Sequence, residues 1–120
     1  MRALLALFSF LAFCAALAQD YPTRTVTIIV PYPAGGPTDQ LARQLAPKLA
    51  EKLGQSFIVE NVSGAATTIA TGRVARAAPD GHTLLLHNLQ ISANVTLYPK
   101  APYDTERDLA YGTVGHDWRR

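Results

Sequence analysis

The feature that most constrains the fold of this chain is an apolar strand pattern that runs directly into a glycine-rich loop. Residues 26–30 read Val-Thr-Ile-Ile-Val, and residues 31–36 read Pro-Tyr-Pro-Ala-Gly-Gly. β-Branched residues favour a buried strand, whereas prolines and glycines favour a turn. A helical pattern begins near Thr38. A strand, tight loop and helix in succession leave unpaired backbone N–H groups at the helix N-terminus, where anions are stabilised.

Residues 1–18 have the pattern of a cleavable secretory signal peptide. Arg2 supplies a positive start, residues 3–16 are almost entirely apolar, and Ala16 and Ala18 form an A-x-A cleavage site. The alternative is a membrane anchor, but the apolar stretch is shorter than the about 20 residues that a spanning helix needs. We therefore expect secretion followed by cleavage.

Cysteine content and charge exclude several classes of function. Cys14 is the only cysteine and would leave with the signal peptide, so we expect no disulfide, cysteine metal site or thiol nucleophile. The net charge is +2, and loss of Arg2 would lower it to +1. Apart from the terminal Arg119-Arg120 there is no basic run, so nucleic-acid binding has little support. A mature chain of about 100 residues can build one small core.

A long helix is predicted after the first loop. Leucines recur every four residues from Leu41 to Leu53 with alanines beside them, which predicts a helix that buries its leucine stripe. Gly54 is expected to end this helix. Pro47 lies inside it, where a proline removes a hydrogen bond and clashes with the preceding turn. We therefore expect a kink or a break near Pro47.

Two more strands are predicted further along the chain. Residues 57–61 read as a second strand, and the small residues 63–68 form a second loop before a short helix to about Ala77. Residues 79–81, Pro-Asp-Gly, predict a turn, and residues 83–87 a third strand. Alternation of strands and helices predicts an α/β fold with a parallel sheet and right-handed crossover helices.

The two small-residue loops have the same position relative to the predicted sheet. Each follows the carboxyl end of a strand and precedes a helix, and ligands bind at this edge of open α/β sheets. Two helix N-termini at one crevice would suit a carboxylate, bound by backbone N–H groups and by the hydroxyls of Thr38, Thr67 and Thr68. The alternative is that the loop glycines only make tight turns.

Short motifs between residues 21 and 109 point to a known family. They are Tyr21-Pro22, the strand and loop at residues 26–36 with Asp39, Leu53-Gly54-Gln55, Val59-Glu60-Asn61, Gly64-Ala65, Ala77-Ala78-Pro79-Asp80-Gly81, Thr83-Leu84-Leu85-Leu86, Asn94, Leu97-Tyr98 and Pro102-Tyr103-Asp104. In order and spacing this set resembles the Bug-type receptors, the substrate-binding proteins of tripartite tricarboxylate transporters. Each motif alone is weak, whereas the ordered set is specific.

The resemblance implies a periplasmic binding-protein fold of type II-like, two-lobed form, with residues 19–109 as part of the first lobe. It implies that the protein is a periplasmic receptor rather than an enzyme. The receptor would capture a small carboxylate (a di- or tricarboxylate or an amino acid) and deliver it to a membrane permease. No cofactor or metal is implied. Backbone amides of the first two loops would grip the ligand, and residues 88–92 would contact its far end. The implied ligand-binding residues are Tyr32, Ala34, Gly35, Gly36, Thr38, Asp39, Ser63, Gly64, Ala65, Ala66, Thr67, Thr68 and Asn88.

The loops depart from the family pattern at several positions. Ala66-Thr67 stand where a glycine pair is usual, and His87 stands where a glycine is common. If that backbone needs a positive φ, Ala66 costs about 1 kcal/mol or more, whereas the Thr67 hydroxyl can add a contact. Pro37 removes one backbone donor from the first loop, although it suits a first helical position.

Residues 110–120 do not match the continuation of the family, whose members are about twice this length or more. We expect a shifted reading frame or a truncated gene, with a real, shortened C-terminus as the alternative, and hence impaired binding. Two other functions stay open, a non-binding fragment and a small secreted enzyme. Ser63-Gly64 lacks the G-x-S-x-G elbow of a hydrolase, and the three histidines form no zinc motif. Asp39 is interpreted as a charge that complements the helix dipole rather than as a general base.

Overall fold

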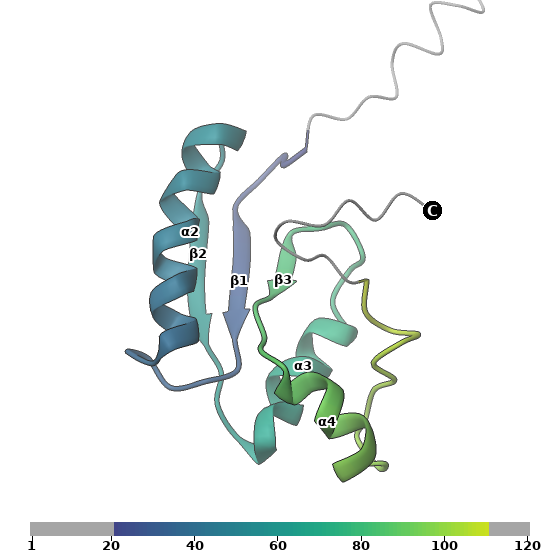
Figure 1. Cartoon of the computed structure of the whole chain (residues 1–120). Coiled ribbons are helices and arrows are strands. Elements are labelled where there is room, and N and C mark those ends of the chain that lie inside the picture. Colours follow the sequence, from purple (N-terminus) through teal and green to yellow (C-terminus); the bar gives the residue numbers. More distant parts are fainter. Residues whose placement is uncertain (1–20, 111–120) are drawn as a thin grey trace, which may run out of the picture.

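The structure, a computed structural model, describes residues 21–110. The predicted signal peptide at residues 1–18 lies outside the described residues, as does the predicted tail beyond residue 110. Among the residues described, no helix is both long and apolar enough to cross a membrane. The elements are β1 (Val26–Val30), α2 (Pro37–Leu53), β2 (Phe57–Asn61), the single 3₁₀ turn η2 (Ala65–Thr67), α3 (Thr68–Ala75), β3 (Thr83–Leu85) and α4 (Gln90–Leu97) (Figure 1).

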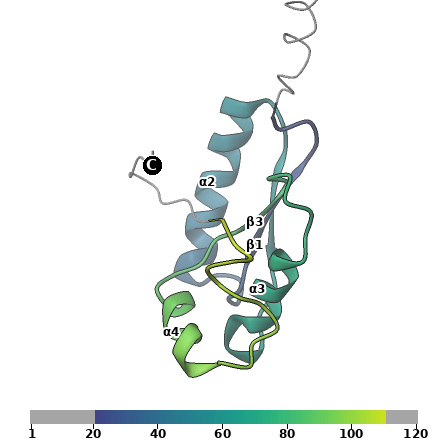
Figure 2. The ribbon, with the colours of Figure 1, turned by 90° about the vertical axis from the view of Figure 1, so that its right-hand side faces the viewer.

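The three strands form one parallel sheet in the order β2-β1-β3. The central strand β1 pairs with β2 from Val26 opposite Phe57 onward, and with β3 from Thr27 opposite Thr83 onward. Helix α2 packs on β1 and β2, whereas α3 packs on β1 and β3. Figure 2 shows these two helices on opposite faces of the sheet. The predicted α/β fold with a parallel sheet is confirmed.

This strand order places three loops at one edge of the sheet. The chain leaves β1 toward β2 and then crosses back past β1 to form β3 on its other side. Right-handed crossovers in opposite directions put the connecting helices on opposite faces. Since all strands are parallel, the segments after β1, β2 and β3 begin at the same edge (Figure 1). This is the switch point where open α/β sheets bind ligands.

The core lies between β1 and α2, and it differs from the predicted leucine stripe. The side chains that α2 buries in the core are those of Ala42 and Ala46. Because these side chains are small, the helix can lie close to the sheet. Leu49 packs against this cluster. Leu41 is 48% exposed and Leu53 is 40% exposed. The prediction of a buried leucine stripe is therefore wrong at both ends of the helix.

Helix α2 begins and ends close to where the sequence predicts. Pro37 is its first residue, and Gly54 follows its last with a φ of +72° and an N–H bonded to the Ala50 carbonyl at 2.9 Å. Of the kink or break predicted near Pro47, the break is wrong, since α2 continues through the proline, whose side chain is exposed. Strands β1 and β2 have the predicted bounds, whereas β3 ends two residues early at Leu85.

Candidate ligand-binding site

The first loop is anchored by the carboxylate of Asp39, a side chain that is 2% exposed. One carboxylate oxygen accepts the backbone N–H of Gly35 at 2.8 Å, and the other accepts the side-chain amide of Asn61 at 3.0 Å. The Nε of Arg43 contacts both oxygens, at 3.0 and 3.1 Å. Asn61 also donates to the Tyr32 carbonyl at 3.1 Å. Asp39 therefore ties the loop after β1 to the end of β2.

The same donors determine the charge of Asp39. They lower its pKa to about 2, with the hydrogen bond from Arg43 as the largest cause and the Gly35 N–H as the next. A carboxylate that is ionised and fully engaged is a poor general base, so the interpretation as a structural charge is supported. Arg43 and Asn61 were not predicted as partners of Asp39, although the i, i+4 spacing of Asp39 and Arg43 signals such a pair.

The first loop leaves backbone amides for a ligand, two of them in the first turn of α2. The N–H of Gly35 is occupied by Asp39, and that of Gly36 is directed at the Pro33 carbonyl at 3.4 Å. Within residues 21–110, the N–H groups of Thr38 and Asp39 meet no acceptor. Both lie in the first turn of α2, where amides lack an intrahelical partner and the helix dipole is positive. Thr38 is thus the better placed of the predicted contacts in this loop.

The second loop has an unusual backbone and also leaves amides without an acceptor among residues 21–110. Ala65, Ala66 and Thr67 have φ values of +44°, +50° and +75°. The Thr67 N–H donates to the Gly64 carbonyl at 3.0 Å, and that of Thr68 to the Ala65 carbonyl. Those of Ala65 and Ala66 have no acceptor in the part of the chain that the structure describes. Ala66 thus adopts the positive φ considered from the sequence.

A chain of side-chain hydrogen bonds joins the three loops. The Tyr32 hydroxyl donates to Asn88 at 2.6 Å and lies 3.1 Å from Nδ1 of His87. On the other side of the ring, Nε2 of His87 lies 3.0 Å from the hydroxyl of Thr67. Asn94 of α4 donates to that hydroxyl and to the Ala66 carbonyl, both at 2.9 Å. The chain runs from the first loop through the segment after β3 to the second loop.

Burial keeps the groups in this chain uncharged. It lowers the pKa of His87 and raises the pKa of Tyr32, in each case as the largest cause. At neutral pH the imidazole and the phenol are therefore both neutral. His87 was absent from the predicted contacts. Its signal in the sequence is a polar residue at the end of an apolar strand.

The predicted contacts gather at this edge but differ in exposure. The buried contacts are Asp39 and Thr67. The hydroxyl of Thr68 donates a hydrogen bond to the Ala65 carbonyl at 2.7 Å. Two of the three predicted hydroxyls, those of Thr67 and Thr68, are therefore engaged within the protein. The exposed contacts are Ala34, Gly35, Ser63, Gly64, Ala65 and Asn88, and the half-buried ones are Tyr32, Gly36, Thr38, Ala66 and Thr68.

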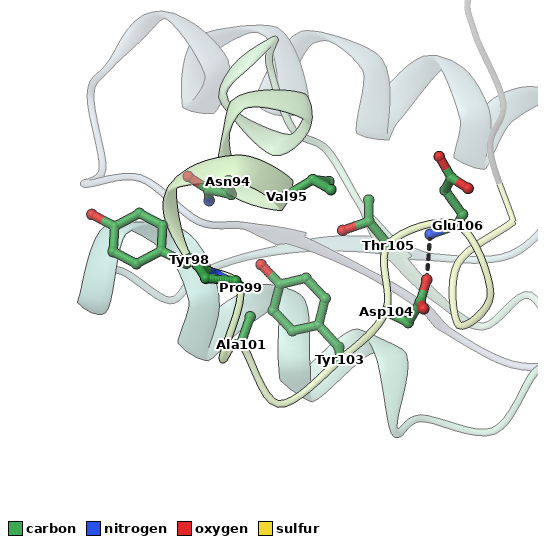
Figure 3. Close-up of a pocket in the computed structure, with 9 residues that line it drawn as sticks. All are labelled: Asn94, Val95, Tyr98, Pro99, Ala101, Tyr103, Asp104, Thr105 and Glu106. Atoms are coloured by element: carbon green, nitrogen blue, oxygen red, sulfur yellow. Dashed lines mark hydrogen bonds between the residues drawn. The ribbon is translucent and has the colours of Figure 1, made fainter.

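A pocket of about 300 Å³ lies at a different place, between α4 and the segment that follows it (Figure 3). Asp104 and Glu106 lie on its wall and disfavour an anion, so the loops are the better carboxylate site. Its lining residues are Asn94, Val95, Tyr98, Pro99, Ala101, Tyr103, Asp104, Thr105 and Glu106. Among residues 21–110, no cluster of three or more histidine, cysteine or acidic side chains is placed to hold a metal ion.

Comparison with known proteins identifies the family. Residues 41–114 match the model of the tripartite tricarboxylate transporter family receptor. The chain belongs to this family. The receptor family consists of periplasmic substrate-binding proteins rather than enzymes.

Curated relatives match most of this chain. A UPF0065 protein from the TAR-I ttuE-ttuC' intergenic region of Agrobacterium vitis is 43% identical over 96 residues, 79% of this chain and 28% of the relative. BugT of Bordetella pertussis is 43% identical over 94 residues, 77% of this chain and 29% of the relative. The chain thus spans less than a third of the length of these receptors.

Solved structures of the receptor family have the same fold. The periplasmic binding protein BugD matches with a TM-score of 0.70 and 44% identity, over 73% of this chain and 29% of BugD. MatC from Rhodopseudomonas palustris with bound malate matches with a TM-score of 0.69 and 48% identity, over 73% of this chain and 30% of MatC. An R. palustris protein with adipate matches with a TM-score of 0.68 and 43% identity, over 72% of this chain and 29% of that protein. Residues 21–110 thus have the fold of part of a periplasmic binding protein, as predicted.

Proposed function

We propose that this chain supplies the carboxylate-gripping loops of a solute-binding receptor of the tripartite tricarboxylate transporter type. The observation that carries the proposal is the presence, within residues 21–110, of unpaired backbone amides in both loops. They include those of Thr38, Asp39, Ala65 and Ala66, all at the carboxyl edge of one parallel sheet. Such donors at helix N-termini bind the oxygens of a carboxylate.

The charges of the loops support an anionic ligand. Asp39 is the one acidic residue in the segments 32–39 and 63–68, and Arg43 pairs with it at 3.0 Å. A ligand carboxylate would therefore meet no unpaired negative side chain from these segments. The protein structures with malate and adipate make small dicarboxylates the first candidates.

Export to the periplasm and delivery of the ligand to a permease are part of the same proposal. Cleavage after Ala18 would release residues 19–120 into the periplasm, where the receptor would carry its ligand to a membrane permease. The complete receptors are more than three times as long as the matched segment, so a second lobe would close over the ligand in them. Enclosure of this kind raises affinity, because pocket sites bury most of a small ligand.

Calorimetric titration of the purified chain tests the proposal. Malate and adipate are the probes, and malamide, which has the shape of malate without its charges, is the control. We expect binding of the two acids and none of the diamide. Nuclear magnetic resonance of the recovered malate distinguishes a receptor from an enzyme, because a receptor returns its ligand unchanged. Absence of heat with every acid would refute carboxylate capture by this chain.

A matched pair of variants locates the site. Ala34→Glu places a negative charge in the first loop, whereas Ala78→Glu places the same charge at an exposed position before the turn that leads into β3. Repulsion between two like charges about 4 Å apart is worth about 1 kcal/mol in bulk water and about 4 kcal/mol near a protein surface, so we expect Ala34→Glu to weaken malate binding about tenfold or more. Ala78→Glu should bind as the unmodified chain does. Equal losses in both variants would place the site elsewhere.

A further inference from the structure

The backbone of the second loop is strained. Ala65, Ala66 and Thr67 follow one another at positive φ, and none of them is a glycine. L-residues disfavour this region because the Cβ atom crowds the following carbonyl oxygen, and a β-branched residue such as threonine is rarest there. Conformations of this kind persist only where surrounding contacts determine them. The loop therefore depends on contacts that hold Thr67.

Thr67 is held by side chains from three segments. Thr71 of α3 donates to its carbonyl at 2.9 Å, and Asn94 of α4 donates to its hydroxyl at 2.9 Å. Nε2 of His87 contacts the same hydroxyl at 3.0 Å. A threonine hydroxyl both donates and accepts, so this contact is a hydrogen bond in either imidazole tautomer.

His87 is the one of these three that also reaches the first loop. Its Nδ1 lies 3.1 Å from the Tyr32 hydroxyl, and the two rings meet edge to face at 5.5 Å between centroids. Among the described residues, the side chains within hydrogen-bonding distance of the imidazole are those of Tyr32 and Thr67, and the Asn88 backbone is the remaining partner. The phenol of Tyr32 is the titratable group among them. The imidazole is thus a bridge between the two loops.

We propose that His87 is a positioning residue, which braces Thr67 against Tyr32 and so keeps the second loop in its left-handed conformation. That conformation leaves the amides of Ala65 and Ala66 unpaired. Without the brace, Thr67 relaxes to negative φ and the peptide groups before it rotate. The part of this inference that concerns a ligand rests on the proposed function, whereas the part that concerns loop conformation does not.

Two replacements of His87 separate its hydrogen bond from its bulk. His87→Phe keeps a planar ring and removes the bond to Thr67, whereas His87→Gln keeps a group that can donate and accept. The three-bond coupling between amide and α protons reports φ for residues 65–67 in the full chain. We expect the couplings to change in His87→Phe and to stay near those of the unmodified chain in His87→Gln. Unchanged couplings in His87→Phe would overturn the proposal.

Malate binding tests the consequence for the site. We expect His87→Phe to weaken malate binding about tenfold, which corresponds to one lost hydrogen bond, and His87→Gln to recover most of the affinity. Equal weakening by both replacements would overturn a role through the hydrogen bond. If the unmodified chain does not bind malate, the proposed function fails, and the couplings still decide the role of His87.

A double-mutant cycle shows whether His87 acts through Thr67. Glycine adopts positive φ without strain, so Thr67→Gly removes the need for a brace. In that background we expect His87→Phe to weaken malate binding less than twofold. A tenfold loss in both backgrounds would mean that His87 acts independently of Thr67 and would overturn the inference.

Discussion

The side chain of Asn61 donates a hydrogen bond to the buried carboxylate of Asp39 at 3.0 Å. Asn61 is the last residue of β2, and Asp39 lies in the first turn of the helix that follows β1. One side-chain contact therefore couples the ends of two neighbouring strands. With the bonds from Gly35 and Arg43, it gives the first loop its shape before any ligand arrives. A preformed loop reduces the entropy that binding must overcome.

Removal of the Asn61 amide should destabilise the fold. In Asn61→Ala, the Asp39 carboxylate and the Tyr32 carbonyl each lose a donor in a buried or half-buried position. We expect the free energy of unfolding to fall by about 1–3 kcal/mol. Urea unfolding measures it, and Gln44→Ala, an exposed amide on α2, is the control with an expected change of about 0.5 kcal/mol or less. Similar losses in both variants would contradict an anchoring role.

Acid should weaken the protein partly through Asp39. Its pKa is lowered from 3.8 to about 2, so its stabilising contribution is complete above pH 4 and is lost as the pH falls toward 2. Asp80 and Asp108, whose pKa values are also lowered, act in the same direction. Urea midpoints of the unmodified chain should fall between pH 4 and pH 2, and Asp39→Asn should show a smaller fall. Parallel curves for the two proteins would exclude Asp39 as a source of acid sensitivity.

His87 should make the stability of the fold depend on pH in a second, higher pH range. Burial lowers its pKa below 6.5, so the unfolded chain takes up a proton more readily than the folded one as the pH falls below that value. Stability should therefore decrease from about pH 6.5 downward and level off below the folded pKa. Denaturant unfolding at a series of pH values measures this decrease. The decrease should disappear in His87→Gln, which has no titratable group, and its persistence there would assign it to another residue.

Two glycines separate backbone strain from steric clash. Gly54 and Gly81 have φ values of +72° and +78°, but an added Cβ meets nothing within 4 Å at Gly54 and lies 2.9 Å from the Tyr21 ring at Gly81. We expect Gly54→Ala to cost about 1–2 kcal/mol of unfolding free energy from strain alone. Gly81→Ala should cost more, because the ring must move and its hydroxyl bond to the Gly81 carbonyl, 2.6 Å long, is disturbed. Thermal or urea unfolding measures both, and equal costs would show that the Tyr21 ring adapts freely.

Local signals predicted the three strands and the helices α2 and α3, but α4 (Gln90–Leu97) was not predicted. β1 and β2 have the predicted bounds, because each is a short run of β-branched and aromatic residues bordered by turn residues. Gly54 ends α2 as predicted, since a left-handed C-terminal residue is a local requirement. The wrong predictions concern which side chains of α2 are buried and whether the helix continues through its internal proline. Leu41 is exposed because no described element covers that side of α2, and α2 continues through Pro47, whose side chain is exposed.

The sequence by itself determined the alternation of strands and helices, the two small-residue loops and, through its ordered motifs, the receptor family. These features depend on residues within a few positions of one another, where propensity and turn chemistry act directly. Only the tertiary structure decided which backbone amides remain unpaired and which side chains brace the loops. Gly35 gives its N–H to Asp39, and His87 meets Thr67 across 20 residues of chain. Such partners depend on the strand order β2-β1-β3, because the sheet brings segments distant in sequence to one edge.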